Sequence, residues 1–151
     1  MIKAVAHLRS NAPGWASQYV GVPFVEHGRG LDGWDCWGLF CFVYREHLGI
    51  ELPDFDGDYE NTEDVAEIAR LFDSGLKDWE EVPERDSRPF DGVLVHMLGR
   101  ASHCAIYLGD GKMLHALHGS DTTIIRVRSH LWHPTGFYRF RKSGAMQTSS
   151  A

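Results

Sequence analysis

Cys36 is the residue of this chain best placed to act as a nucleophile. It follows Asp35, a good N-cap residue, and it opens the apolar stretch Cys36–Leu48, which predicts a buried helix. The unpaired N–H groups and the dipole at a helix N-terminus stabilise a thiolate, and the same groups can hold an oxyanion. The position therefore predicts an activated thiol. The alternative is a buried structural cysteine, the ordinary role of a cysteine in an apolar helix.

The other two cysteines, Cys41 and Cys104, fit that structural role. Three is an odd number and the chain has no CxxC pair. Cys36 and Cys41 would also point in different directions from one helix, so a bridge between them is unfavourable. We expect free thiols and no disulfide framework.

A thiol nucleophile usually works with an imidazole base, and two of the nine histidines stand out. His103 and His115 lie on the two arms of a predicted hairpin. Alternation along a strand puts His103, Ala105 and Tyr107 on one face, and the small Ala105 leaves room for a second ring. Either histidine could instead be an ordinary sheet residue. We expect surface or structural roles for the others: His7, His27, His47, His96, His118, His130 and His133.

Zinc binding is an alternative role for these histidine and cysteine residues. However, His103 and Cys104 would point to opposite faces of the sheet, and no close pair has the spacing of a usual zinc site. We expect no metal and no cofactor.

The turn of the hairpin decides whether the two imidazole rings can meet. A two-residue turn at Asp110 and Gly111 would place His115 opposite Ile106, facing away from His103.

A three-residue connection changes this pairing. With Gly109–Gly111 as the loop and Gly111 left-handed, His115 lies opposite Ala105, diagonal to His103 on the same face. We predict the three-residue connection, because the chemistry needs both rings on one face.

Helices and strands must position these residues, and they occupy different halves of the chain. The expected helices are Asn11–Val20, Cys36–Leu48 (ended by Gly49) and Thr62–Ser74, with a glycine-rich loop at Gly28–Gly33. The expected strands are Gly92–Leu98, Ser102–Leu108, Lys112–Leu117, Thr122–Val127 and Gly136–Phe140. Helices first and sequential strands later predict an α+β fold, with N-terminal helices packed on an antiparallel sheet.

Composition limits the domain organisation and the partners. The 151 residues fit one domain, which we place at 1–142, followed by a flexible tail at 143–151. A net charge of −6 without a basic cluster gives no support for nucleic-acid binding, and no apolar run is long enough to span a membrane. The start, Met1–Arg9, is too short and too polar for a signal peptide, so we expect a protein made without a standard export signal.

Several stretches resemble the motifs of the NlpC/P60 cell-wall peptidases. Asp35–Leu39 is similar to the family's Asp-Cys-x-Gly-Leu, and Ser102–Gly109 is similar to its histidine strand. Met113–Ala116 resembles the next strand, which carries the third polar group, and Pro89–Val95 resembles the strand before the histidine strand. The order agrees, and the resemblance runs from about Trp15 to Phe140.

The resemblance implies a papain-like α+β fold with the catalytic cysteine at the start of the central helix. It also implies hydrolysis of amide bonds in peptidoglycan stem peptides. In that scheme Cys36 attacks the carbonyl, His103 accepts and later returns the proton, and His115 orients and polarises His103.

A narrower resemblance points to peptidases of phage tail tips and gene-transfer agents. It is carried by Trp15–Pro23, Trp37, the ending Gly136–Arg139 and the expected lack of an export signal. Such a protein would ride in the virion tail beside other tail proteins and open the wall locally during genome entry.

Two positions depart from the family pattern. Trp37 stands where many members have a serine that, with the preceding aspartate, binds a free amine of the stem peptide. Phe24, twelve residues before Cys36, stands where many members have a tyrosine. Asp35, Trp37 and Phe24 are therefore the candidate substrate-binding residues, and the alternative for Asp35 is a plain N-cap.

Two other functions stay open. The chain could be a structural tail-tip component that keeps the fold without using catalysis. The chain could also be a thiol acyltransferase or a hydrolase of another amide, because the same catalytic residue types serve several acyl transfers.

Overall fold

A computed structural model describes residues 13–53, 55, 76–97, 100–128 and 133–141. The helical elements are α2 (Gly14–Ser17), α3 (Cys36–Val43), the π-helix η1 (Tyr44–Leu48), and the 3₁₀ turns η2 (Leu76–Asp78) and η3 (Glu84–Asp86). The strands are β1 (Arg29–Gly30), β2 (Gly33–Trp34), β3 (Trp79–Val82), β4 (Gly92–Met97), β5 (Arg100–Gly109), β6 (Lys112–His115), β7 (Thr123–Arg126) and β8 (Pro134–Phe140). None of the described helices is long and apolar enough to cross a membrane.

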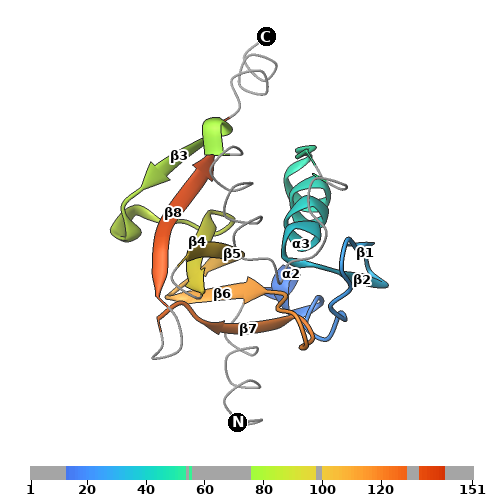
Figure 1. The fold of residues 1–151 in the computed structure, drawn as a ribbon. Coiled ribbons are helices and arrows are strands. Elements are labelled where there is room, and N and C mark those ends of the chain that lie inside the picture. The colour runs from blue at the N-terminus through green and yellow to red at the C-terminus, as the bar shows by residue number, and fades with distance from the viewer. Residues whose placement is uncertain (1–12, 54, 56–75, 98–99, 129–132, 142–151) are drawn as a thin grey trace.

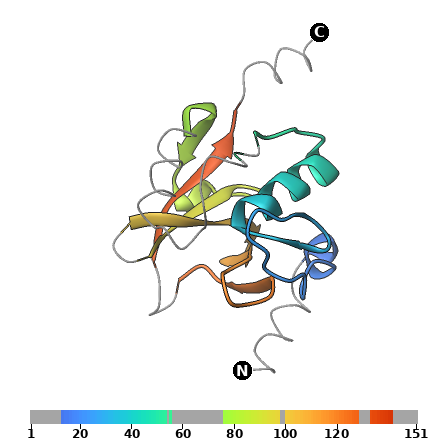
Figure 2. The same ribbon diagram turned by 45° about the vertical axis from the view of Figure 1, so that its right-hand side comes forward.

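Six of the strands form one sheet in the order β3-β8-β4-β5-β6-β7, and every neighbouring pair is antiparallel (Figure 1). Helix α3 packs beside β5, near the middle of this sheet, and the short β1–β2 ribbon lies against the start of α3 (Figure 2). The fold is thus α+β, as the sequence predicts.

The sheet separates two apolar clusters because side chains alternate along each strand. The helix-side core lies between α3 and the sheet. Its strand residues are Leu94, Cys104, Ile106, Leu108, Leu114 and Ile124. The second core lies on the opposite face and consists of Val82, Val93, Val95, Ala105, Met113, Val127 and Phe137. Consecutive residues of β5 therefore belong to different cores. The side chains of His103 and Cys104 leave the strand on opposite faces of the sheet.

Helix α3 begins and ends where its sequence predicts. The carboxylate of Asp35 accepts a hydrogen bond from the N–H of Gly38, which caps the first turn. Gly49 follows the last turn in the left-handed conformation, with φ of 66°. The predicted single helix Cys36–Leu48 is divided, however, because its last five residues, Tyr44–Leu48, wind as a π-helix.

Several other elements differ from the expectation. The first helix covers only Gly14–Ser17 of the predicted Asn11–Val20, of which positions 11 and 12 lie outside the described residues. The predicted helix Thr62–Ser74 and the tail 143–151 also lie outside the described residues. The β1–β2 ribbon replaces part of the predicted glycine-rich loop, and β3 is a strand that the sequence reading missed.

The β5–β6 hairpin has the predicted register but not the predicted turn. Ile106 lies opposite Leu114, and Tyr107 lies opposite Met113, the pairing that brings His115 level with Ala105. The prediction of a three-residue connection was wrong. Gly109 pairs with Lys112 across a two-residue turn, and a bulge before Gly109 shifts the register by one residue.

Candidate active site

His103 on β5 and His115 on β6 form the centre of the candidate site. The Nε2 atom of His103 lies 3.0 Å from the Nδ1 atom of His115, with the ring planes at 72°. The hairpin register puts both side chains on one face, and Ala105 between them is too small to separate the rings. A bulge between Val95 and His96 on the neighbouring strand shifts the pairing beside His103, and bulges of this kind re-aim side chains next to active sites.

Both imidazoles are buried, and burial favours their neutral form. His103 is 3% exposed and His115 is 4% exposed. Burial, and then the neighbouring His115, lower the pKa of His103 to about 3, while burial lowers the pKa of His115 to about 4. At neutral pH the two rings therefore share one hydrogen bond without net charge.

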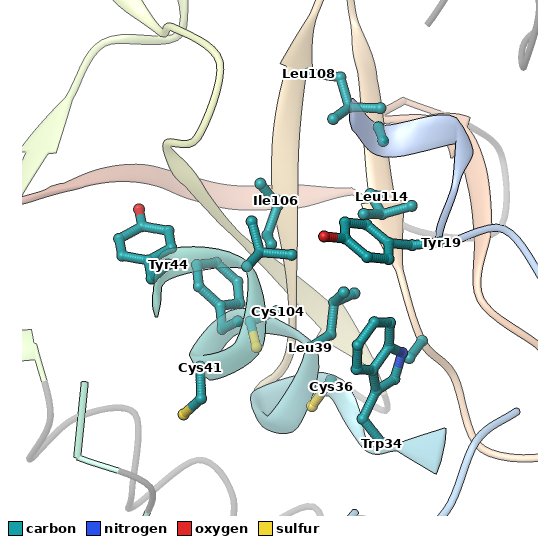
Figure 3. Packing of buried hydrophobic residues seen from close by; sticks show 14 of the residues in the cluster. Tyr19, Trp34, Cys36, Leu39, Cys41, Tyr44, Cys104, Ile106, Leu108 and Leu114 are labelled. Atoms are coloured by element: carbon teal, nitrogen blue, oxygen red, sulfur yellow. The ribbon is translucent and has the colours of Figure 1, made fainter. Parts of the chain in front are cut away.

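Cys36 is the first residue of α3 and is 4% exposed. Its side chain lies in the same helix-side core as that of Cys104, the residue that follows His103 on β5 (Figure 3). The structure has no hydrogen bond between Cys36 and His103. The two histidines are therefore in contact with each other, whereas Cys36, the candidate nucleophile, lies on the side of Cys104. All three cysteines are free thiols.

Asp35 is completely buried and is held by three donors. One oxygen accepts from the N–H of Gly38 at 2.8 Å and from Nη1 of Arg29 at 3.0 Å, and the other accepts from the N–H of His27 at 3.0 Å. The carboxylate therefore joins the helix start to the segment before it. The structure supports the N-cap role for Asp35, and its role in substrate binding stays a prediction.

The same region is packed too tightly for side chains at two glycines. A Cβ atom on Gly38 would lie 2.0 Å from the carbonyl oxygen of Gly28, and one on Gly28 would lie 2.3 Å from the carbonyl oxygen of Gly33. The segment carrying Arg29 thus rests directly on the first turn of α3.

Trp37 is half-buried and is fixed by its neighbours. Its indole N–H donates to the carbonyl oxygen of Pro53 at 2.8 Å, and its ring stacks on Phe40 with centroids 5.5 Å apart. Phe55 lies 5.6 Å from the same ring. An indole has no acceptor, so Trp37 cannot replace a serine hydroxyl that accepts from an amine.

Phe24 forms an isolated bridge with Trp34, two residues before Cys36, and packs against the helix-side core. Its ring meets the ring of His118 edge to face, with centroids 5.3 Å apart. Like Trp37, Phe24 lies close to the segment that carries Cys36, and a contact of either residue with substrate stays a prediction.

Sequence reasoning missed one residue of this site. Arg29, expected to lie in a loop, is the cation that faces the buried Asp35. Cys104 is a buried core residue, as expected, and it belongs to the same cluster as Cys36. Within the described part of the chain, no three His, Cys, Asp or Glu side chains gather as a metal site would require.

Known proteins match the chain over most of its length. The NlpC/P60 family matches residues 21–141. The gamma-DL-glutamyl hydrolase of Bacillus subtilis (strain 168) is 29% identical over 133 residues, which cover 83% of this chain and 28% of that protein. The tail tip assembly protein K of Escherichia phage N15 is 35% identical over 104 residues, which cover 65% of this chain and 41% of that protein.

The fold also matches solved structures. The NlpC/p60 domain of the peptidoglycan hydrolase SagA superposes with a TM-score of 0.56 at 20% identity, covering 91% of this chain and 97% of that domain. The chain spans less than half of the length of the two curated relatives, and almost all of the solved domain.

Proposed function

The chain belongs to the NlpC/P60 family, and on that premise we propose that it is a cysteine endopeptidase that hydrolyses amide bonds in peptidoglycan stem peptides. The observation that carries the proposal is the hydrogen bond between His103 and His115, with Cys36 in the same core as the next residue of β5. Cys36 is the nucleophile, His103 is the acid and base, and His115 is its partner.

The His103–His115 contact supports an assignment of the nitrogen that takes the proton. Nε2 of His103 faces His115, which leaves Nδ1 for the thiol. For Nδ1 to accept the thiol proton, Nε2 must carry the ring hydrogen and donate it to Nδ1 of His115. The Cys36 thiolate then attacks the carbonyl carbon, and His103 returns the proton to the leaving amine as the C–N bond breaks. Water hydrolyses the thioester that remains.

The start of α3 supplies the groups that stabilise the oxyanion. Asp35 takes the N–H of Gly38 through its side chain and the N–H of Leu39 through its carbonyl oxygen. The N–H groups of Cys36 and Trp37 have no acceptor within the helix, as is usual for the first turn. We assign these two N–H groups to the substrate oxygen, because charge develops there during attack.

The same proposal places the chain in a phage tail tip. The match to tail tip assembly protein K supports this location, since that relative is 35% identical over most of this chain. In the tail the peptidase would cleave wall peptides locally during genome delivery, with other tail proteins as its partners.

Digestion of purified peptidoglycan tests the activity. Mass spectrometry of the products should show new amino and carboxyl termini within the stem peptides, and their sequence identifies the bond. Cys36→Ala is the matched control and should release none of these termini. Intact sacculi after treatment with the unchanged chain would overturn catalysis and favour a structural tail role. Locating the chain in purified particles by immunolabelling tests the tail assignment separately.

A further inference from the structure

Trp34 and Thr122 form a buried contact that the proposed mechanism does not use. The indole N–H of Trp34 donates a hydrogen bond to the hydroxyl oxygen of Thr122 at 2.8 Å, although 88 residues separate the two in the sequence. Both side chains are completely buried, and the Trp34 ring also meets the rings of Tyr19 and Phe42, with centroids 5.6 and 5.3 Å away. Loss of the acceptor would therefore leave a buried N–H group without a partner.

Each end of this bond lies next to the candidate active site. Trp34 precedes Cys36 by two residues, and its ring lies beside the start of α3 (Figure 3). Thr122 is followed by Thr123, the first residue of β7, which lies directly opposite His115 in the pairing of β6 with β7. The bond thus connects the segment of the proposed nucleophile to the part of the sheet that carries the histidine pair.

Backbone hydrogen bonds support this connection. Thr122 exchanges two of them with residues 21–22, at 2.9 and 2.8 Å. Trp34 exchanges two with residues 23–25, at 3.1 and 3.0 Å. The chain just before β1 therefore lies between the two segments, and the bond between the side chains of Trp34 and Thr122 joins them directly.

The separation of Cys36 and His103 depends on contacts of this kind. Cys36 belongs to α3 and His103 to β5, and these two described side chains share no hydrogen bond. In the proposed mechanism a proton passes between them, which requires that the two groups come within hydrogen-bond reach. Misplacement of reacting groups by about 1 Å can cost roughly 100-fold in rate. A bond that fixes Trp34 relative to the histidine hairpin therefore affects the reaction.

We propose that Thr122 is a positioning residue, whose hydroxyl group accepts from Trp34 and thereby holds Cys36 within reach of His103. This inference rests on the proposed function, in which His103 takes the proton of the Cys36 thiol. Thr122 acts through Trp34 and takes no part in bond cleavage.

The test measures the reaction of Cys36 with iodoacetamide at neutral pH, without any wall substrate. Mass spectrometry that locates the adduct at Cys36 gives the rate in the unchanged full chain and in four variants. Thr122→Val removes the hydroxyl group at similar volume, whereas Thr122→Ser keeps it. Tyr44→Phe is the matched control, because it removes a buried hydroxyl group that donates to the carbonyl oxygen of Phe90, beyond the last residue of α3. His103→Gln gives the rate without the proposed base.

Loss of the acceptor should slow the reaction. We expect Thr122→Val to lower the rate at Cys36 by about tenfold, toward the rate of His103→Gln, because the thiol loses its alignment with the base. Thr122→Ser and Tyr44→Phe should react like the unchanged chain. Loosening of the fold alone would act in the opposite direction, since Cys36 is 4% exposed and opening would speed its reaction.

Three results would overturn the proposal: an unslowed Thr122→Val variant, equal slowing in the Val and Ser variants, or equal slowing in Tyr44→Phe. If Thr122→Val does not fold, Trp34→Phe, which removes the donor, takes its place with the same outcomes.

The same measurements separate this inference from the proposed function. If His103→Gln reacts as fast as the unchanged chain, the pairing of Cys36 with His103 fails, and the inference fails with it. If His103→Gln is slowed but Thr122→Val is not, the proposed pairing stands and only the role of Thr122 is overturned.

Discussion

Nε2 of His103 and Nδ1 of His115 are 3.0 Å apart although the residues lie on different strands. The contact depends on one register of the β5–β6 hairpin, since a shift by one residue would turn His115 to the other face of the sheet. A bulge before Gly109 provides this register despite a two-residue turn. The backbone of the hairpin is therefore part of the proposed catalytic apparatus.

Removal of the His115 ring should lower the rate of wall-peptide cleavage. We expect His115→Ala to reduce kcat by roughly 100-fold or more, because His103 loses the acceptor that orients it. His115→Asn or His115→Gln should retain more activity, since either amide can accept from Nε2 of His103. Steady-state kinetics on a soluble stem-peptide substrate would check this. Equal activity in the Ala and Asn variants would remove His115 from the mechanism.

A plot of kcat/KM for wall-peptide cleavage against pH should be bell-shaped, with its acid limb displaced to low pH. A thiol and an imidazole must both be in the correct state, which gives two limbs. Because burial lowers the pKa of His103 to about 3, the acid limb of kcat/KM should lie below the pH of 6.5 typical of a free histidine. A rate that rises in one step near the pKa of a free thiol, about 8.5, with no limb at the lower pKa of His103, would argue against His103 as the partner of Cys36.

Acid should destabilise the fold through the same two residues. An unfolded histidine titrates near 6.5, whereas the folded pKa is about 3 for His103 and about 4 for His115. Between these values the unfolded chain binds more protons, so stability rises with pH and is lost as pH falls from 6.5 toward 4 and 3. Urea denaturation across this window measures the slope. The double variant His103→Gln, His115→Gln should have a shallower slope, and an unchanged slope would contradict the account.

Arg29 should contribute more to stability than an exposed arginine. Arg29→Met leaves the buried carboxylate of Asp35 without its cation, which should cost roughly 3 kcal/mol in the free energy of unfolding. The matched control is Arg141→Met, whose partner Glu80 is half exposed, and which should change the unfolding midpoint little. Urea denaturation midpoints compare the two. Equal effects would mean that Asp35 is satisfied by its backbone donors alone.

The local structure around this site could be predicted well from the sequence. Asp35 as cap, Gly49 as stop, and alternation along β5 are properties of single residues and their neighbours, and the structure agrees with each. The hairpin register could be predicted because only one pairing puts two histidines on one face. The turn could not, because the sequence Gly109-Asp110-Gly111 is compatible with both lengths: Asp-Gly suits a two-residue turn, and Gly111 suits the left-handed end of a three-residue loop. In the structure Asp110 and Gly111 both have positive φ, as a two-residue turn requires.

Long-range partners account for what the sequence does not reveal. Arg29 faces Asp35 only because Gly28 and Gly38 allow the two segments to touch, and no local pattern marks that contact. Strand β3 was missed for a similar reason. Two of its four residues, Glu80 and Glu81, are charged and exposed, and the strand forms at the sheet edge through pairing with β8.

The hydrogen bonds of the Asp35 carboxylate also limit how the segments around it can move. It is bonded to the backbone of His27 and of Gly38, so the segment before β1 cannot lift from α3 without releasing the first turn of the helix. We therefore expect these pieces to open as one cooperative unit, so that amide protons on both segments exchange with solvent together. The proposed nucleophile, Cys36, is the first residue of that helix. Its exposure to reagents and substrates is thereby linked to the lifetime of three hydrogen bonds to a side chain that takes no part in bond cleavage.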